Sequence, residues 1–116
     1  MDHYNWNEIP AERMTPLLTR QVIHTGHMTI AKLNLGKGAL VPLHHHVNEQ
    51  VTMLESGVLR FVLDGVEVIV KGGDALRIPP NVPHLVEALE DSVATDLFSP
   101  PRADWISGDD SYLRNR

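Results

Sequence analysis

The sequence predicts an all-β fold, either a sandwich or a barrel, and three observations support this. Short runs of alternating apolar and polar residues follow one another, and turn signals separate them roughly every 8–12 residues. One pair of runs has the spacing of a tight hairpin. No amphipathic helix is evident between residues 20 and 100. Alternation with a period of two suits a sheet that buries one face in a core.

The run from His27 to Leu35 shows this alternation clearly. Thr29, Ala31, Leu33 and Leu35 fall on one face, and the residues between them fall on the other. The glycine-rich run that follows, residues 36–38, ends the strand.

A hairpin is predicted for residues 58–63 and 66–70. The two runs are separated by Asp64-Gly65, and this dipeptide favours a two-residue turn because both positions accept a positive φ.

Further strands are expected at residues 51–57, ending in a turn at Gly57, and at 85–91 and 92–99. Residues 75–84 are expected to form a short strand that runs into a proline-rich corner. The tail begins with Pro100-Pro101 and is rich in turn formers, so we expect it to wrap the barrel or pack on a partner. A single helical turn is expected around Ala103 to Ile106, and Asp109-Asp110 is interpreted as a solvated turn.

The amino-acid composition excludes several classes of site and function. A chain of 116 residues with 42% hydrophobic residues predicts one folded domain over residues 1–116. The absence of cysteine excludes disulfides, zinc-thiolate sites and cysteine nucleophiles. A net charge of −5 without a basic run argues against nucleic-acid binding. No apolar stretch reaches the length of a membrane span, and the N-terminus lacks a signal-peptide pattern, so the cytoplasm is the expected location.

Three consecutive histidines are the most informative feature. On a strand, residues i and i+2 share a face, so His44 and His46 point the same way and His45 points away. Two imidazoles side by side on a rigid strand can supply two of the ligands of a site that binds Zn, Fe, Ni, Cu or Mn. The alternative is a solvated histidine patch beside a loop.

Gln50 has the same parity as His46, whereas Glu49 does not. The intervening Val47-Asn48 could form a turn, which would shift this parity. Glu49 therefore stays open as an alternative metal ligand to Gln50.

The stretch from Gly38 to Gly57 resembles the first motif of the cupin family, G-x5-H-x-H-x3-4-E-x6-G, with His44 and His46 at the histidine positions. Gln50 stands where this motif has its acidic residue.

The stretch from Gly73 to His84 resembles the second cupin motif, in which Pro79 matches and Asn81 replaces a glycine. The final asparagine position of that motif holds Ala88. Asparagine also tolerates the left-handed backbone that glycine adopts.

The resemblance implies a cupin β-barrel, a double-stranded β-helix or jelly roll, with short irregular N- and C-terminal segments. The metal-binding motifs span residues 38–57 and 73–84. It also implies one divalent transition metal ion, Zn, Ni, Mn, Fe or Cu, held by His44, His46, Gln50 and His84. With glutamine in place of a carboxylate all four ligands are neutral, which should weaken metal affinity and favour Lewis-acid chemistry over redox chemistry.

A narrower resemblance concerns the KdgF subgroup of cupins, which acts in pectin degradation. Asp96, Phe98 and Arg102 have the spacing of three residues that lie near the metal in that subgroup and are needed for its activity. The resemblance implies a tautomerase or isomerase that converts 4,5-unsaturated monouronates into linear keto forms. Arg102 would bind the substrate carboxylate, Asp96 would move a proton, and Phe98 would form an apolar wall.

Other interpretations of these three residues remain open. Asp96 is also consistent with a charge at a strand edge, Phe98 with core packing, and Arg102 with a surface residue paired to the acidic tail. Two alternative functions are a metal-dependent dioxygenase and a non-enzymatic small-molecule sensor. The expected partners are a small acidic sugar and a second copy of the chain in a homodimer, with neither nucleic acid nor membrane.

Overall fold

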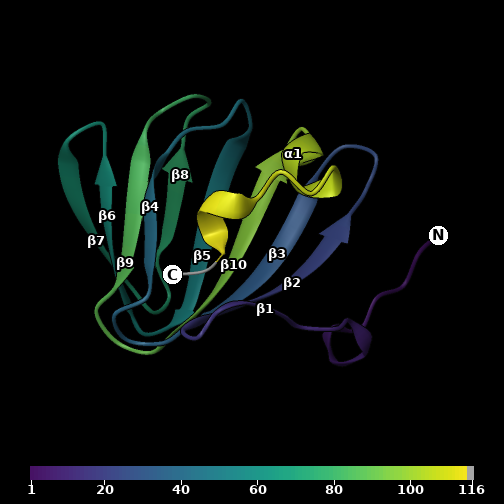
Figure 1. The fold of residues 1–116 in the computed structure, drawn as a ribbon, viewed down its shortest axis with the longest axis horizontal. Coiled ribbons are helices and arrows are strands. Elements are labelled where there is room, and N and C mark those ends of the chain that lie inside the picture. The colour runs from purple at the N-terminus through teal and green to yellow at the C-terminus, as the bar shows by residue number, and fades with distance from the viewer. Residues whose placement is uncertain (115–116) are drawn as a thin grey trace.

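The computed structural model describes residues 1–114 and contains two antiparallel sheets that face each other (Figure 1). The strands of the larger sheet, in spatial order, are β1 (Glu12–Thr15), β2 (Leu18–His24), β3 (Thr29–Leu35), β10 (Ser92–Ser99), β5 (Glu49–Ser56) and β8 (Ala75–Ile78). Those of the smaller sheet are β4 (Leu40–His44), β9 (His84–Ala88), β6 (Val58–Leu63) and β7 (Val66–Lys71). The helical segments are η1 (Trp6–Glu8), α1 (Ala103–Ile106) and η2 (Ser111–Leu113).

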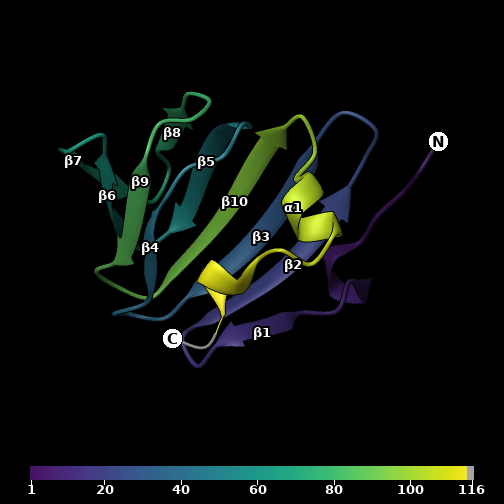
Figure 2. The ribbon, with the colours of Figure 1, turned by 45° about the horizontal axis from the view of Figure 1, so that its top comes forward.

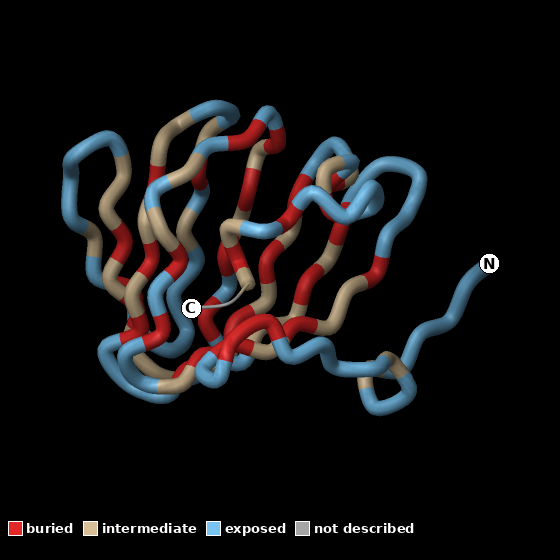
Figure 3. The backbone as a smooth tube through the Cα atoms, viewed as in Figure 1, coloured by how far each residue is buried: buried red, intermediate tan, exposed pale blue. Residues whose placement is uncertain are grey.

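The inner faces of the two sheets form the core of a jelly-roll barrel, as the sequence predicts. Burial alternates along β10, where Ala94, Asp96 and Phe98 are buried and the residues between them are partly exposed. Along β3, Ala31 and Leu35 lie on the buried face that the alternation predicts. Figure 3 shows the buried positions on the strands and the exposed positions at the turns and the N-terminus. The period-two pattern therefore decides which side chains enter the barrel.

The predicted hairpin forms at β6 and β7, with Leu63 paired to Val66. Asp64 and Gly65 have φ values of 47° and 82°, as a two-residue turn with two left-handed positions requires. Strand β7 extends to Lys71, one residue beyond the predicted end.

The backbone conformation at motif positions 57 and 81 explains why glycine and asparagine stand there. Gly57 has φ 96°, and a Cβ atom there would meet the Ser92 side chain and the Asp91 carbonyl oxygen. Asn81 has φ 63°, so it adopts the left-handed conformation expected of a residue that replaces glycine. Both positions turn the chain where the barrel requires a sharp corner.

The first hairpin, β1 and β2, is not among the strands that the sequence pattern predicts. Its strands pair through Glu12 and Arg20, and β2 continues the larger sheet by pairing with β3. The described residues contain no helix long and apolar enough to cross a membrane.

The C-terminal segment folds back over the barrel (Figure 2), where α1 lies over the larger sheet and η2 lies beside β4. The predicted helical turn at Ala103–Ile106 is correct. The interpretation of Asp109-Asp110 as a solvated turn holds for Asp109 but is wrong for Asp110, which is buried. Asp110 Oδ2 accepts a hydrogen bond from Arg20 Nη2 at 2.9 Å, and both side chains are about 5% exposed or less.

We predict that this buried ion pair anchors the C-terminal segment. Asp110→Ala should lower the free energy of unfolding by about 3 kcal/mol, because it leaves the Arg20 charge buried beside Glu12 alone. Urea unfolding followed by tryptophan fluorescence checks this, since the Trp105 ring packs 4.5 Å from the Arg20 guanidinium. Asp109→Ala, at the exposed neighbouring position, is the control and should change stability by less than about 0.5 kcal/mol. Equal stability of the two variants would contradict the anchoring role.

Candidate metal centre

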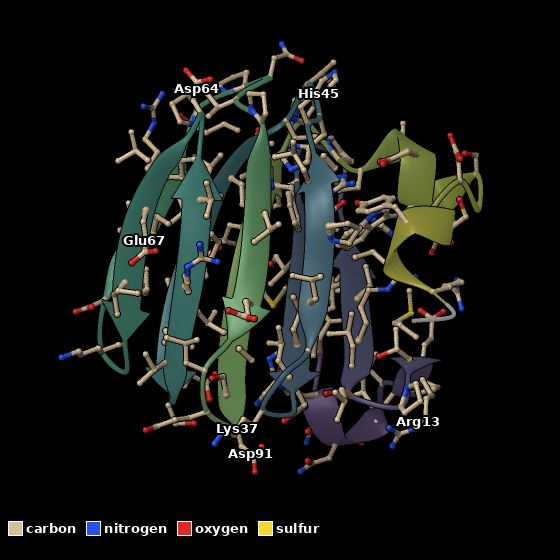
Figure 4. All side chains as sticks on the ribbon, turned by 60° about the vertical axis from the view of Figure 1, so that its left-hand side comes forward. Arg13, Lys37, His45, Asp64, Glu67 and Asp91 are labelled. Atoms are coloured by element: carbon tan, nitrogen blue, oxygen red, sulfur yellow. The ribbon has the colours of Figure 1, made fainter. Side chains whose placement is uncertain are left out.

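Three histidines from two segments of the chain converge inside the barrel. His44 ends β4, His84 begins β9, and these two residues are partners in the antiparallel ladder. His46 follows in the loop after β4. One ring nitrogen of each lies within 4.8 Å of those of the other two, and the His44 and His84 ring centroids are 4.2 Å apart. His45 is exposed and lies at the rim of the barrel, at the end opposite Lys37 and Asp91 (Figure 4).

Backbone carbonyl groups fix the orientation of all three rings. Each Nδ1 lies within hydrogen-bonding distance of a carbonyl oxygen two residues away: Pro42 O at 2.8 Å from His44, Asn48 O at 3.1 Å from His46, and Val82 O at 2.9 Å from His84. A carbonyl oxygen only accepts, so each Nδ1 carries the hydrogen and each neutral ring keeps a lone pair on Nε2. Metal-ligating histidines use this arrangement, in which one nitrogen is held by a hydrogen bond and the other faces the ion.

Burial keeps these imidazoles neutral. Burial, with a smaller contribution from the neighbouring His84, lowers the pKa of His44 to about 3. Burial lowers the pKa of His46 to about 4, with a contribution from the positive charge of Arg102. The pKa of His84 is also lowered, chiefly by burial. Neutral imidazole is the form that binds a metal ion.

The donor atoms in this cluster fit a divalent cation. His84 Nε2 is buried and has no hydrogen-bond partner within residues 1–114. His46 Nε2 lies 3.1 Å from Gln50 Oε1, so a lone pair faces an amide oxygen. Two acceptors at that distance repel unless a cation lies close to both. Three imidazole nitrogens and one amide oxygen form the neutral donor set that several first-row divalent ions accept.

Gln50 and Glu49 lie on opposite sides of β5. Gln50 is buried beside His46, whereas Glu49 Oε2 accepts a hydrogen bond from Arg77 Nε at 2.6 Å near the surface. Gln50 thus lies on the side of His46, as the parity argument expects, although residues 45–48 form a loop and not the continuous strand that the argument assumes.

The second predicted group shares a cavity with the histidines. An interior cavity of about 50 Å³ is lined at its polar end by His44, Gln50 and His84, and also by Asp96, Phe98 and Arg102. The remainder is lined mostly by apolar core side chains, together with Arg20, Thr52 and Tyr112. Residues of both predicted groups are thus brought together, although they come from four strands, β4, β5, β9 and β10, and from the position just before α1.

Asp96 is buried on β10, where its Oδ1 accepts a hydrogen bond from Thr52 Oγ1 at 2.6 Å. Burial raises the pKa of Asp96 to about 6, against the opposing effects of the Thr52 hydrogen bond and the Arg102 charge. A carboxyl group with such a pKa exchanges a proton readily near neutral pH.

Arg102 is almost fully buried and its guanidinium is held on several sides. Nε and Nη2 donate to the two carboxylate oxygens of Asp104 at 3.0 and 2.7 Å, and Nη2 also donates to the Tyr112 hydroxyl at 2.6 Å. The guanidinium carbon lies 4.7 Å from the Phe98 ring centroid and 4.2 Å from that of Trp105. Asp104 therefore occupies the Nε–Nη2 fork of the guanidinium, and a substrate carboxylate would have to bind through Nη1.

Two residues of this site have no signal in the sequence. Tyr112 lines the cavity, its ring centroid lies 4.7 Å from that of His44, and its hydroxyl also accepts from Trp105 Nε1 at 3.2 Å. Thr52 also lines the cavity, between Gln50 and Asp96. Tyr112 lies in the irregular tail and Thr52 on an ordinary strand, so no motif or spacing distinguishes either of them.

Comparison with known proteins agrees with this geometry. Residues 31–99 match the cupin domain family. The chain is 32% identical over 103 residues to the pectin degradation protein KdgF of Dickeya dadantii (strain 3937), and the match covers 86% of this chain and 94% of that relative.

Two solved structures are similar over most of the chain. The structure of KdgF from Halomonas sp. has a TM-score of 0.84 at 28% identity and covers 90% of this chain and 98% of that one. The crystal structure of an RmlC-like cupin from Shewanella frigidimarina has a TM-score of 0.83 at 27% identity. The match covers 90% of this chain and 96% of that one. The resemblance that the two motifs indicate is thus confirmed, as is the cupin barrel.

We predict that His84→Ala weakens divalent metal binding at least about 100-fold, since loss of a ligand should exceed the 10–100-fold cost of losing an outer-shell partner. Titration calorimetry of chelator-treated protein with Zn²⁺ measures this effect. His45→Ala is the matched control, because His45 is exposed at the rim, and it should bind Zn²⁺ like the unaltered protein. Equal affinities of the two variants would contradict the assignment of the site.

Proposed function

The chain belongs to the cupin family, and on this basis we propose that it is a metal-dependent isomerase that converts ring-form 4,5-unsaturated monouronates into linear keto forms. The proposal is supported chiefly by one observation: a cavity lined by two of the three clustered histidines, His44 and His84, together with a buried carboxyl group and a buried guanidinium. The similarity to proteins named KdgF, one of them named for pectin degradation, supports the choice of an acidic sugar.

The reaction is an isomerisation that moves one proton within the substrate. The hydroxyl oxygen on C1 loses its proton, the bond between C1 and the ring oxygen breaks, and C1 becomes an aldehyde. The ring oxygen remains on C5 as a ketone, and C4 gains a proton. A divalent ion held by His44, His46, His84 and Gln50 would polarise a sugar oxygen as a Lewis acid.

Asp96 is the group proposed to carry the proton. In its ionised form it accepts the proton from the C1 hydroxyl, and in its protonated form it delivers the same proton to C4. The raised pKa of about 6 suits both steps, because general acid–base catalysis is most effective when the pKa lies near the working pH.

Arg102 is proposed to bind the substrate carboxylate through Nη1. Asp104 and Tyr112 hold the guanidinium in place, so little side-chain freedom is lost when the substrate binds. Phe98 packs under the guanidinium and edge-on to His46, and it forms an apolar wall that excludes water.

The proposal also requires movement of the C-terminal segment. A cavity of about 50 Å³ holds only a few water molecules, at roughly 10–15 Å³ each, whereas small-molecule sites usually measure about 300–1,000 Å³. Trp105 and Leu113 line the cavity from this segment, so outward movement of these two side chains would enlarge it while Asp104 and Tyr112 keep their bonds to Arg102.

The direct test is conversion of a 4,5-unsaturated monouronate by the metal-loaded protein. We expect loss of the ultraviolet absorbance of the conjugated double bond and appearance of the linear keto form by NMR. Chelator treatment should stop the reaction, and restoring the metal should recover it. An unchanged substrate with any of the candidate ions would overturn the proposal, and consumption of oxygen would favour a dioxygenase instead.

We predict that kcat/KM rises as the pH increases through about 6, because Asp96 must be ionised to accept the proton. Asp96→Asn should lower kcat about 10²–10⁴-fold and abolish this pH dependence. Steady-state kinetics of both proteins between about pH 5 and 8 measure both effects. The control is Asp91→Asn, which should leave the kinetics unchanged. Asp91 lies in the loop before the same strand, at the far end of the barrel (Figure 4). A pH profile that Asp96→Asn leaves unaltered would contradict this role.

A further inference from the structure

A chain of hydrogen bonds connects the metal cluster to Asp96. Gln50 Nε2 donates to Thr52 Oγ1 at 2.9 Å, and Thr52 Oγ1 donates to Asp96 Oδ1 at 2.6 Å. All three side chains are buried, with exposures of 5%, 1% and 6%. Thr52 and Asp96 are register partners on the adjacent strands β5 and β10, so the sheet itself fixes their separation.

When Asp96 is ionised, the donors and acceptors in this chain have only one consistent order. An ionised carboxylate accepts hydrogen bonds and donates none, so the single hydroxyl hydrogen of Thr52 goes to Asp96. The Thr52 oxygen must then accept from Gln50, which places the amide NH₂ group of Gln50 towards Thr52. The amide oxygen is left facing His46 Nε2 at 3.1 Å.

Without Thr52, the opposite amide orientation would be preferred in the metal-free protein. A rotation of the amide by about 180° would let its NH₂ group donate to the lone pair on His46 Nε2. That hydrogen bond would occupy the nitrogen that faces the metal and would direct the amide oxygen away from it. In the rotated state Gln50 Oε1 would meet Thr52 Oγ1, whose hydrogen already points to Asp96, so Thr52 disfavours the rotation.

We infer that Thr52 is a positioning residue for the metal centre: its hydroxyl, oriented by Asp96, holds the Gln50 amide with the oxygen towards the ion. The inference rests on the metal site of the proposed function and not on the identity of the sugar. Asp96 thereby has a second role, in which it sets the direction of the hydrogen-bond chain through Thr52.

The test compares Thr52→Val, which removes the hydroxyl at nearly constant shape, with Thr52→Ser, which retains it. The probe is Co²⁺, because its visible absorption bands report the ligand set and titration gives the affinity. We expect Thr52→Val to bind Co²⁺ about 10–100-fold more weakly and with altered bands, as is typical when an outer-shell partner is lost. Thr52→Ser should resemble the unaltered protein.

Two controls separate positioning from packing. Thr95→Val removes a hydroxyl from the neighbouring strand, where Thr95 bonds to Glu55 at the surface, and it should leave Co²⁺ binding unchanged. In a Gln50→Ala background, Thr52→Val should have no further effect on affinity, because the amide that it positions is absent.

Several outcomes would overturn the inference. One is a Thr52→Val protein that binds Co²⁺ as tightly as the unaltered protein and with the same bands. Others are a Thr52→Ser protein as weak as Thr52→Val, or an additive loss of affinity in the Gln50→Ala background. Failure of the unaltered protein to bind Co²⁺ or Zn²⁺ would instead overturn the metal site on which both proposals rest.

Discussion

The bonds from three histidine Nδ1 atoms to backbone carbonyl groups are the constraint on which the candidate site depends. They leave Nε2 as the nitrogen with the lone pair in His44, His46 and His84, and one ring nitrogen of each lies within 4.8 Å of those of the other two. These bonds in turn require the local backbone to be rigid. The β4–β9 ladder supplies this rigidity for His44 and His84, which are directly paired.

The loop that carries His46 is fixed from two sides. Asn81 N donates to the His46 carbonyl oxygen at 2.8 Å, which joins the loop to the corner before β9. The buried Asn48 side chain donates to the carbonyl oxygens of Pro100 and Pro101, which joins the loop to the segment leading to Arg102. The histidine cluster and the candidate substrate-binding arginine are therefore joined through one set of hydrogen bonds.

Much of the fold and of the cluster can be predicted from the sequence because both follow from local rules. Period-two alternation orients Asp96 and Phe98 into the barrel, and residues with a left-handed backbone mark the corners at Asp64 and Asn81. What escapes prediction depends on contacts between distant residues. Arg20 and Asp110 are 90 positions apart, and nothing near either residue indicates a buried ion pair. The binding of Asp104 to the Arg102 fork also depends on how the tail folds back, which spacing does not reveal.

The central claim is that one divalent ion is bound by the Nε2 atoms of the three histidines and by the Gln50 amide oxygen. The most direct measurement is a crystal structure of the metal-loaded protein, with the ion located by its anomalous scattering. The account predicts one ion per chain at that position, with those four atoms at about 2.0–2.2 Å. An ion held by Nδ1 atoms or by Glu49, or an anomalous map without a peak inside the barrel, would contradict it.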